Sequence, residues 1–122
     1  MKAFKTRTFQ RWAGKVGVTD AALLNAIVQM ERGLIDADLG GNLYKQRVAL
    51  PRRGKSGSTR TIIATRFAGV LFFLYGFEKS DRDNISAKEF ALYQRLARGL
   101  LEMTEVQIAT ALAEQVLMEV TR

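Results

Sequence analysis

The chain has 122 residues, 48% of them hydrophobic and 25% charged, with 19 Lys and Arg against 12 Asp and Glu. This length and composition are typical of one globular domain and exclude a wholly disordered chain. Cysteine and histidine are both absent, which excludes disulfides, thiolate chemistry, histidine-ligated zinc and a histidine base. We therefore expect no metal site and no cofactor, and any catalysis must use Arg, Lys, Tyr or carboxylates.

The N-terminus and the longest apolar run predict a cytoplasmic protein with no membrane partner. The opening residues turn polar at once and lack the apolar stretch of a signal peptide. The longest apolar run, Phe67–Phe77, is too short to cross a bilayer. The sequence also offers no cationic amphipathic helix that would anchor the chain on a membrane surface.

The N-terminal third predicts one strand followed by two helices. Residues 2–5 form a short strand whose inward anchor is Phe4. Thr8 is the expected cap of a helix that reaches about residue 15, and Thr19 caps a second helix that reaches about residue 32. The two helices should form a hairpin.

The middle of the chain predicts three consecutive strands. After a Gly-Gly-Asn turn, residues 43–50 alternate so that Lys45 and Arg47 share a face, and Pro51 ends the strand. Residues 52–58 read as a basic loop. Residues 59–67 and 70–77 form a hairpin, and the second of these strands is apolar on both faces, as a central strand covered on both sides would be.

The C-terminal part predicts two helices and an edge strand. Ser86 with Glu89 three residues later is a capping-box pattern for a helix that reaches about residue 103. Thr104 with Gln107 repeats the pattern before a helix over 106–113, and residues 116–120 could add an edge strand. The element order favours an α+β fold, a small antiparallel sheet with two N-terminal helices and C-terminal helices. We expect a single domain over 1–122, with its core at about 2–103 and an extension at 104–122.

The positive charge is concentrated in one stretch of the sequence. No acidic residue occurs between Asp38 and Glu78, and the stretch carries seven cations, which equal the formal net charge of +7. Clustered cations repel one another, so such a stretch predicts an anionic partner, with nucleic acid as the leading candidate. These cations are Lys45, Arg47, Arg52, Arg53, Lys55, Arg60 and Arg66.

One motif in this stretch is similar to a phosphate-binding loop but does not fit the pattern. Gly54-Lys55-Ser56 would need a glycine five places earlier, where Ala49 stands, and a strand follows it instead of a helix. We therefore expect phosphate binding from several strands and loops that converge. For Arg47, Lys55, Arg60 and Tyr75 a structural role stays open, since a strand arginine is often only solvated and a tyrosine in an apolar strand is often core.

Four segments together resemble the RelE and HigB branch of bacterial toxins from type II toxin–antitoxin modules. The resemblance is firm over residues 43–90, looser before them and weakest after about 104. It implies the RelE-like fold and an endonuclease that cuts mRNA at the ribosome. The segments are Tyr44–Ala49, Arg53–Gly57, Arg60–Ile63 and Phe72–Lys79, the last followed by Asn84-Ile85.

For the endonuclease that the resemblance implies, we assign roles from the chemistry of the side chains. Arg47 and Arg60 would stabilise charge on the phosphate, because a guanidinium fork matches phosphate oxygens. Lys55 would be the base or a further cation, its pKa lowered by like charges, and Tyr75 would orient or protonate. Contacts to the RNA would come from Lys45, Arg52, Arg53, Arg66, Lys79 and Arg82.

Other functions stay open. A gyrase-directed toxin of the ParE kind would share the fold, and a non-enzymatic basic protein such as a co-repressor would bind nucleic acid without toxicity. The toxin reading implies an antitoxin protein encoded beside the chain, in this branch often a helix-turn-helix DNA binder. Neither the antitoxin surface nor the general base can be identified from the sequence.

Overall fold

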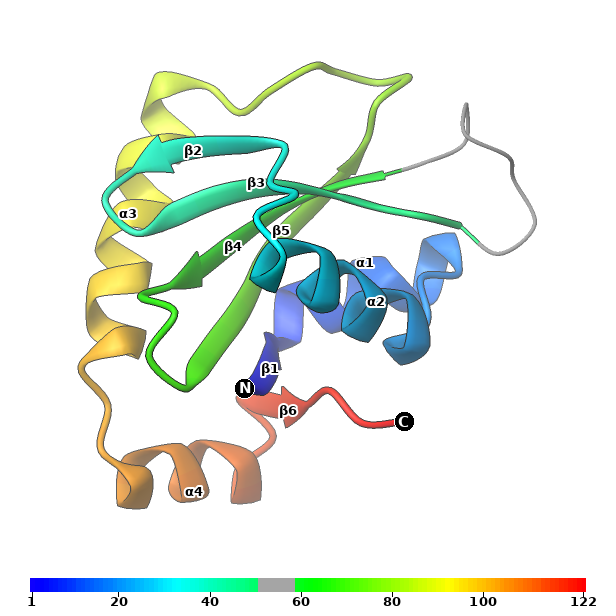
Figure 1. Ribbon diagram of the computed structural model, residues 1–122. Coiled ribbons are helices and arrows are strands. Elements are labelled where there is room, and N and C mark those ends of the chain that lie inside the picture. The colour runs from blue at the N-terminus through cyan, green and yellow to red at the C-terminus, as the bar shows by residue number, and fades with distance from the viewer. Residues whose placement is uncertain (51–58) are drawn as a thin grey trace.

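The computed structural model describes residues 1–50 and 59–122 and shows a six-stranded sheet between two sets of helices (Figure 1). The predicted order of elements is confirmed, apart from one additional strand, β2. The predicted basic loop at residues 52–58 lies outside the described residues. The elements are β1 (Lys2–Thr6), α1 (Arg7–Val16), α2 (Asp20–Glu31), β2 (Ala37–Gly40), β3 (Leu43–Val48), β4 (Thr59–Thr65), β5 (Val70–Glu78), α3 (Ala87–Leu101), α4 (Glu105–Ala113) and β6 (Leu117–Glu119).

The strands lie in the order β2-β3-β4-β5-β1-β6. All neighbouring strands are antiparallel except β1 and β5, which pair in parallel from Lys2 opposite Val70 to Lys5 opposite Phe73. The prediction of an antiparallel sheet is therefore wrong for this one pair. Parallel pairing needs a long crossover, and here α1, α2 and three further strands separate β1 from β5 along the chain.

Each face of the sheet has its own hydrophobic core. On one face, α1 and α2 pack through Phe9, Leu23 and Met30, and on the other α3 and α4 pack through Ala97 and Ala111. Figure 1 shows α1 and α2 on one side of the strands and α3 on the other. The central strand β5 is buried towards both cores, which confirms that it is covered on both sides. In the described part of the chain, no helix has the length and apolar character needed to cross a membrane.

The helix caps follow the sequence at three of four positions. Thr19, Ser86 and Thr104 cap α2, α3 and α4, and the last two form complete capping boxes. The prediction that Thr8 caps α1 is wrong. Thr6 is the cap, because its hydroxyl accepts a hydrogen bond from the backbone N–H of Phe9, so α1 follows β1 without a linker.

A β-bulge in β5 places the side chain of Tyr75 on the α3 side of the sheet. The register between β4 and β5 shifts by one residue after Ile62, so Leu74 has no direct partner on β4. Both Leu74 and Tyr75 consequently pack in the core beneath α3. The next residue, Gly76, lies against the ring of Trp12 on the opposite face, so closely that a Cβ would overlap that ring. The bulge and this close contact together fix the position of Tyr75.

Candidate functional site

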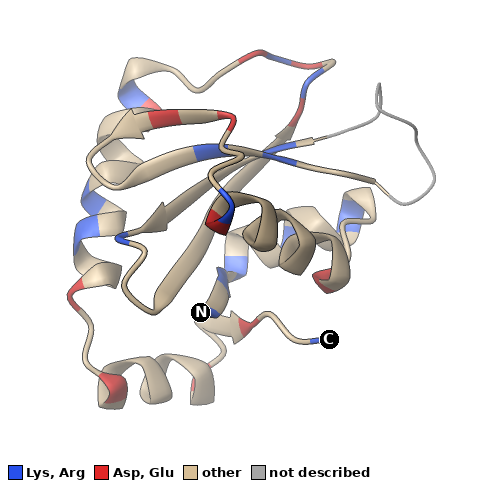
Figure 2. Cartoon of the chain, viewed as in Figure 1, with Lys and Arg blue, Asp and Glu red and all other residues tan. Residues whose placement is uncertain are grey.

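Two arginines face each other across neighbouring strands at one end of the sheet. Arg47 on β3 and Arg60 on β4 are direct cross-strand partners, and strand alternation places both on the α3 side with Lys45. Figure 2 shows basic residues side by side on these two strands. Like charges in this position repel each other and destabilise a sheet. We call Lys45, Arg47, Arg60 and Tyr75 the basic corner.

The two arginines have different surroundings. Arg60 is 5% exposed, and its Nε lies 3.3 Å from Oδ2 of Asp36, while its Nη1 donates to the carbonyl of Thr59 at 3.4 Å. Asp36 lies outside the acid-free stretch, just before β2, and the fold brings its carboxylate to Arg60. Arg47 is exposed. One cation is thus fixed in the sheet and its neighbour faces solvent.

Beside these arginines, Tyr75 belongs to a hydrogen-bonded cluster. Its hydroxyl accepts a hydrogen bond from Nη1 of Arg82 at 3.3 Å, and the Arg82 guanidinium lies 5.6 Å from the centre of the Phe77 ring. Arg82 also forms a two-pronged ion pair with Glu89 on α3. Arg82, predicted as an RNA contact, thus holds the segment between β5 and α3 in place.

The protonation of this cluster is set by its contacts. The hydrogen bonds from Arg82 and from the backbone of Ser86 lower the pKa of Glu89 from 4.5 to about 2. The same pair raises the pKa of Arg82, chiefly through its hydrogen bond with Glu89. Glu89 is therefore a carboxylate at every physiological pH. Since it also accepts from the N–H of Ser86 at 2.8 Å, one side chain both caps α3 and neutralises Arg82.

A second tyrosine supports the first. The rings of Tyr75 and Tyr93 stack with their centres 5.3 Å apart and their planes at 26°. Burial raises the pKa of Tyr93 to about 12, so its hydroxyl stays protonated. Tyr93 of α3 therefore holds the ring of Tyr75 in place, while the Tyr75 hydroxyl remains beside Arg82.

The other predicted contacts fall into three groups. Lys45 of the basic corner donates to the carbonyl of Asp83 at 3.4 Å, and exposed Lys79, just after the end of β5, lies near the corner. Arg66 lies six residues beyond Arg60, about 20 Å along β4, and donates to the carbonyl at the end of α3. The structure therefore does not bring Arg66 to the basic corner. Arg52, Arg53 and Lys55 lie outside the described residues.

Three residues of this site were not predicted from the sequence. Asp36 gave no signal, because it precedes a strand that was not predicted. Glu89 was recognised only as a helix cap, although its carboxylate binds Arg82 as well. Tyr93 stands four residues after Glu89, one helical turn along the same face of α3, and this spacing could have placed it beside the site.

The arrangement is suited to binding a phosphate group. An exposed guanidinium lies next to a second one held in fixed geometry, and a tyrosine hydroxyl lies on the same face two residues along the neighbouring strand. Fixed cations of this kind stabilise charge that develops on phosphate oxygens. Among the described residues, no group of three or more acidic side chains is placed to hold a metal ion.

Comparison with known proteins identifies a family. The family model described as the RelE toxin of the RelE / RelB toxin-antitoxin system matches residues 1–120. A search of curated proteins finds no match. The matched range includes the whole basic corner and all the strands and helices in the described part of the chain.

Proposed function

The chain belongs to the RelE family of toxins from toxin–antitoxin systems, and on this premise we propose that it is an endoribonuclease that cuts mRNA on the ribosome. A toxin of this family has an antitoxin partner, which we propose to be of the helix-turn-helix type. The observation that carries the proposal is the cross-strand pair of Arg47 and Arg60, with Tyr75 on the same face of the sheet. The proposed reaction needs no metal and takes place in the bacterial cytoplasm.

The proposed reaction is a transfer of phosphorus between two oxygens of the RNA. The 2′-oxygen of a ribose forms a bond to the adjacent phosphorus as the bond from phosphorus to the 5′-oxygen breaks. The 2′-hydroxyl gives its proton to a base, and the leaving 5′-oxygen gains a proton from an acid. The products are a 2′,3′-cyclic phosphate and a 5′-hydroxyl.

Arg47 and Arg60 would stabilise the extra negative charge of the five-coordinate phosphorus. Arg60 is suited to this because the Asp36 carboxylate holds its guanidinium in one orientation before the substrate arrives. Arg47 is exposed and can close on a phosphate oxygen. Loss of one such cation typically slows a reaction by a factor of about 100 to 1000.

The proton transfers are assigned to the remaining residues of the predicted site. Tyr75 would orient the reacting ribose or donate a proton, because its hydroxyl is held beside the Arg82 guanidinium and its ring is fixed by Tyr93. Lys55 is proposed as the base or as a further cation. Lys45 and Lys79 would hold the RNA backbone on either side of the reacting phosphate. Arg52 and Arg53 would add further contacts to the RNA.

A translating extract tests the proposal. Purified protein is added to extract with a defined message, and new 5′ ends are mapped with and without ribosome engagement. We expect cleavage within the translated region, only while ribosomes occupy it. Cleavage of naked RNA at the same sites and rate would argue against the ribosome as the site of action.

The alternatives give different results in the same experiment and in cells. A gyrase-directed toxin would leave the message intact and induce DNA-damage signalling on expression. A non-enzymatic nucleic-acid-binding protein or co-repressor would bind RNA or DNA in a salt-dependent way, with no new 5′ ends and no growth arrest. Either outcome would replace the ribonuclease proposal.

A further inference from the structure

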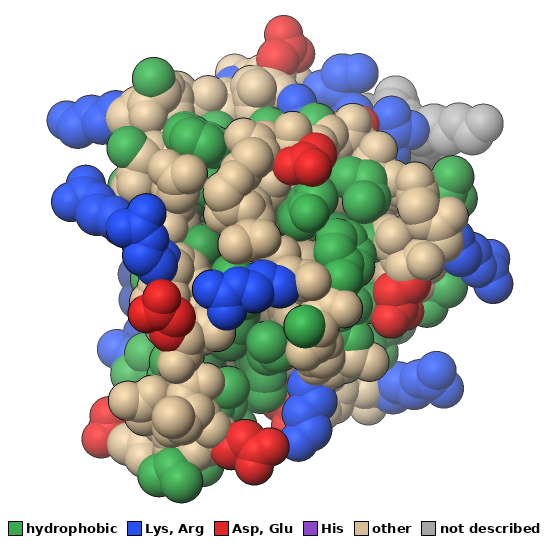
Figure 3. Space-filling model, turned by 60° about the vertical axis from the view of Figure 1, so that its left-hand side comes forward, with side chains coloured by type: hydrophobic (Ala, Val, Ile, Leu, Met, Phe, Trp, Pro, Cys, Tyr) green, Lys and Arg blue, Asp and Glu red, His purple; other side chains and the backbone are tan. Residues whose placement is uncertain are grey.

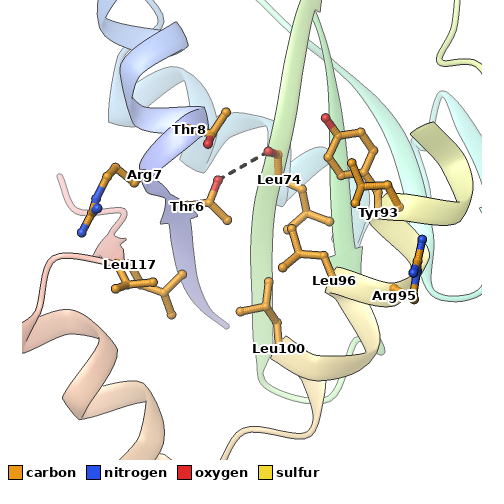
Figure 4. A pocket seen from close by; sticks show the side chains of 11 residues that line it. Thr6, Arg7, Thr8, Leu74, Tyr93, Arg95, Leu96, Leu100 and Leu117 are labelled. Atoms are coloured by element: carbon orange, nitrogen blue, oxygen red, sulfur yellow. Dashed lines mark hydrogen bonds between the residues drawn. The ribbon is translucent and has the colours of Figure 1, made fainter. Parts of the chain in front are cut away.

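A large groove lies beside Tyr93, the residue that stacks on Tyr75. It has a volume of about 860 Å³, and we call it the apolar groove (Figure 4). In Figure 4, Leu96 of α3 lies on one side of it and Leu117 of β6 on the other. Its lining includes Leu74, Leu92, Tyr93, Leu96, Val116 and Leu117.

The apolar groove is separate from the groups proposed to react. Tyr93 belongs to its lining, whereas Tyr75, Arg82 and the arginine pair of the basic corner do not. A phosphate bound on the basic corner would therefore lie outside the groove. Tyr75 would meet this phosphate through its hydroxyl, because Tyr93 covers one face of its ring.

Arg82 differs from the basic side chains that project into solvent in Figure 3. Its side chain is 32% exposed, and each nitrogen of its guanidinium donates a hydrogen bond within the chain. Nε donates to the carbonyl of Asn84 at 3.0 Å, and Nη1 donates to the Tyr75 hydroxyl at 3.3 Å and to Glu89 at 3.1 Å. Nη2 donates to the other carboxylate oxygen of Glu89. With its charge balanced and these donors engaged, Arg82 is poorly placed to bind a phosphate.

The contact with Arg82 sets the direction of the Tyr75 hydroxyl. A guanidinium donates hydrogen bonds and accepts none, so the Tyr75 oxygen is the acceptor in this contact. The hydroxyl proton therefore points away from Arg82 and can be donated to an oxygen of a substrate. Tyr75 and Arg82 both line a cavity of about 330 Å³, which gives a substrate access to this pair.

We propose that Glu89 and Arg82 are positioning residues, which direct the proton of the Tyr75 hydroxyl to an oxygen of the reacting phosphate. Glu89 fixes the guanidinium through a two-pronged ion pair, and the guanidinium fixes the hydroxyl. Because this role rests on the proposed cleavage of mRNA, it selects hydrogen-bond donation to the phosphate as the function of Tyr75. Arg82 then contributes to the rate of cleavage and not to the binding of RNA.

Glu89 also caps α3, and two variants separate this role from positioning. The Ser86 hydroxyl accepts from the N–H of Glu89 at 3.1 Å, and the Glu89 carboxylate accepts from the N–H of Ser86 at 2.8 Å. Glutamine can take the same place in a capping box, as Gln107 does in α4. Glu89→Gln therefore keeps the cap and loses the ion pair, whereas Ser86→Ala weakens the cap and keeps the ion pair.

Single-turnover cleavage of a defined message on ribosomes, at increasing toxin concentration, tests the proposal. For Glu89→Gln we expect the maximal rate to fall at least about 10-fold, because a misplaced group slows the chemical step. The toxin concentration that gives half of this rate should stay within about 2-fold of wild type. Ser86→Ala is the matched control, which should lower the melting temperature by a similar amount and keep both values within about 2-fold.

A double variant shows whether Glu89 acts through Tyr75. Once Tyr75→Phe has removed the hydroxyl, adding Glu89→Gln should change the maximal rate by less than about 2-fold. A full further loss in the double variant, a wild-type rate in Glu89→Gln or an equal loss in Ser86→Ala would overturn the inference and leave the proposed function intact. A raised half-saturating concentration with an unchanged maximal rate would also overturn it, in favour of RNA binding by Arg82. Absence of cleavage by wild type would overturn the proposed function and this role together.

Discussion

The basic corner and the apolar groove lie on the same side of one sheet but differ in how their side chains are held. In the basic corner, Arg60 is fixed by Asp36, and Tyr75 is fixed by Arg82 and Tyr93. In the groove, apolar side chains such as Leu92 and Val116 stay about half exposed, at 52% and 47%. A site whose groups are already fixed is suited to chemistry, whereas exposed apolar groups are suited to a partner that covers them.

The structural origin of this difference is the path of α3. Its first turn carries Glu89, whose ion pair with Arg82 fixes the segment after β5 against α3. Farther along, α3 contacts β3, β4 and β5, while α4 packs over Phe4 of β1 and Leu117 of β6. The same helix therefore completes one site and forms one wall of the other, and substitutions can separate the two.

The largest effect is expected from Arg60→Ala. This change removes a buried cation, leaves Asp36 without its partner, and should lower the free energy of unfolding by about 2–3 kcal/mol. It should also slow cleavage by a factor of about 100 to 1000, since a fixed charge next to the phosphate is lost. Urea unfolding and cleavage kinetics of the folded protein measure the two effects. A stable variant with full activity would show that Arg60 has neither role.

A smaller loss of stability is expected from Gly76→Ala. The added Cβ would overlap the Trp12 ring behind Tyr75, and overpacking of this kind costs about 1–3 kcal/mol. Gly99→Ala is the control, because a Cβ at that position of α3 meets nothing within 4 Å. Thermal unfolding of both variants makes the comparison, and an equal shift in the two melting temperatures would contradict the tight packing at Gly76.

Glu89→Gln should lower the free energy of unfolding by about 1 kcal/mol at neutral pH. The ion pair with Arg82 is partly exposed, with the Glu89 side chain at 26%, so solvent screens much of its strength. Because folding lowers the pKa of Glu89 from 4.5 to about 2, its contribution is complete above pH 4.5 and is lost as the pH falls through about 2.

Unfolding of wild type and Glu89→Gln at several pH values checks this dependence. The two curves of stability against pH should run apart above pH 4.5 and converge towards pH 2. Glu105→Gln, an exposed change in the first turn of α4, is the control and should stay close to wild type. A constant difference between Glu89→Gln and wild type down to pH 2 would rule out the ion pair as its cause.

The smallest effect is the one that separates the two sites. Leu96→Asp should leave the cleavage rate of free toxin within about 2-fold of wild type, since Leu96 is an exposed residue of α3 and lines a groove whose lining includes neither Arg47 nor Arg60. Single-turnover cleavage in the absence of antitoxin measures this. A loss of 10-fold or more with an unchanged melting temperature would show that the groove and the basic corner act as one site.

Local patterns were enough to predict most of the fold. Polar residues before apolar helices located three caps, and alternation in residues 43–50 placed Lys45 and Arg47 on one face. The cap at Thr6 was missed because Thr8 is an equally good cap by residue type, and only the direct passage from β1 to α1 decides between them. β2 was missed because its four residues, Ala37–Gly40, include Asp and Gly, which are rare in strands.

The candidate site depends on contacts that no local pattern records. Charge bias along the sequence pointed to Arg47 and Arg60, and strand pairing places them opposite each other. Asp36 reaches Arg60 only through the pairing of β2 with β3, and the bulge that aims Tyr75 arises from a one-residue shift between β4 and β5. Such long-range registers follow from packing of the whole sheet and cannot be read from neighbouring residues.

In the proposed reaction the exposed cation of the basic corner, Arg47, acts on the RNA phosphate, and Arg47→Ala removes that cation alone. The measurement is the single-turnover rate of mRNA cleavage on translating ribosomes, for wild type, Arg47→Ala and Arg11→Ala, an exposed arginine of α1 outside the site. We expect a loss of about 100- to 1000-fold for Arg47→Ala, with stability unchanged and Arg11→Ala within about 2-fold of wild type. Equal rates for the three proteins, or no cleavage by wild type, would contradict it.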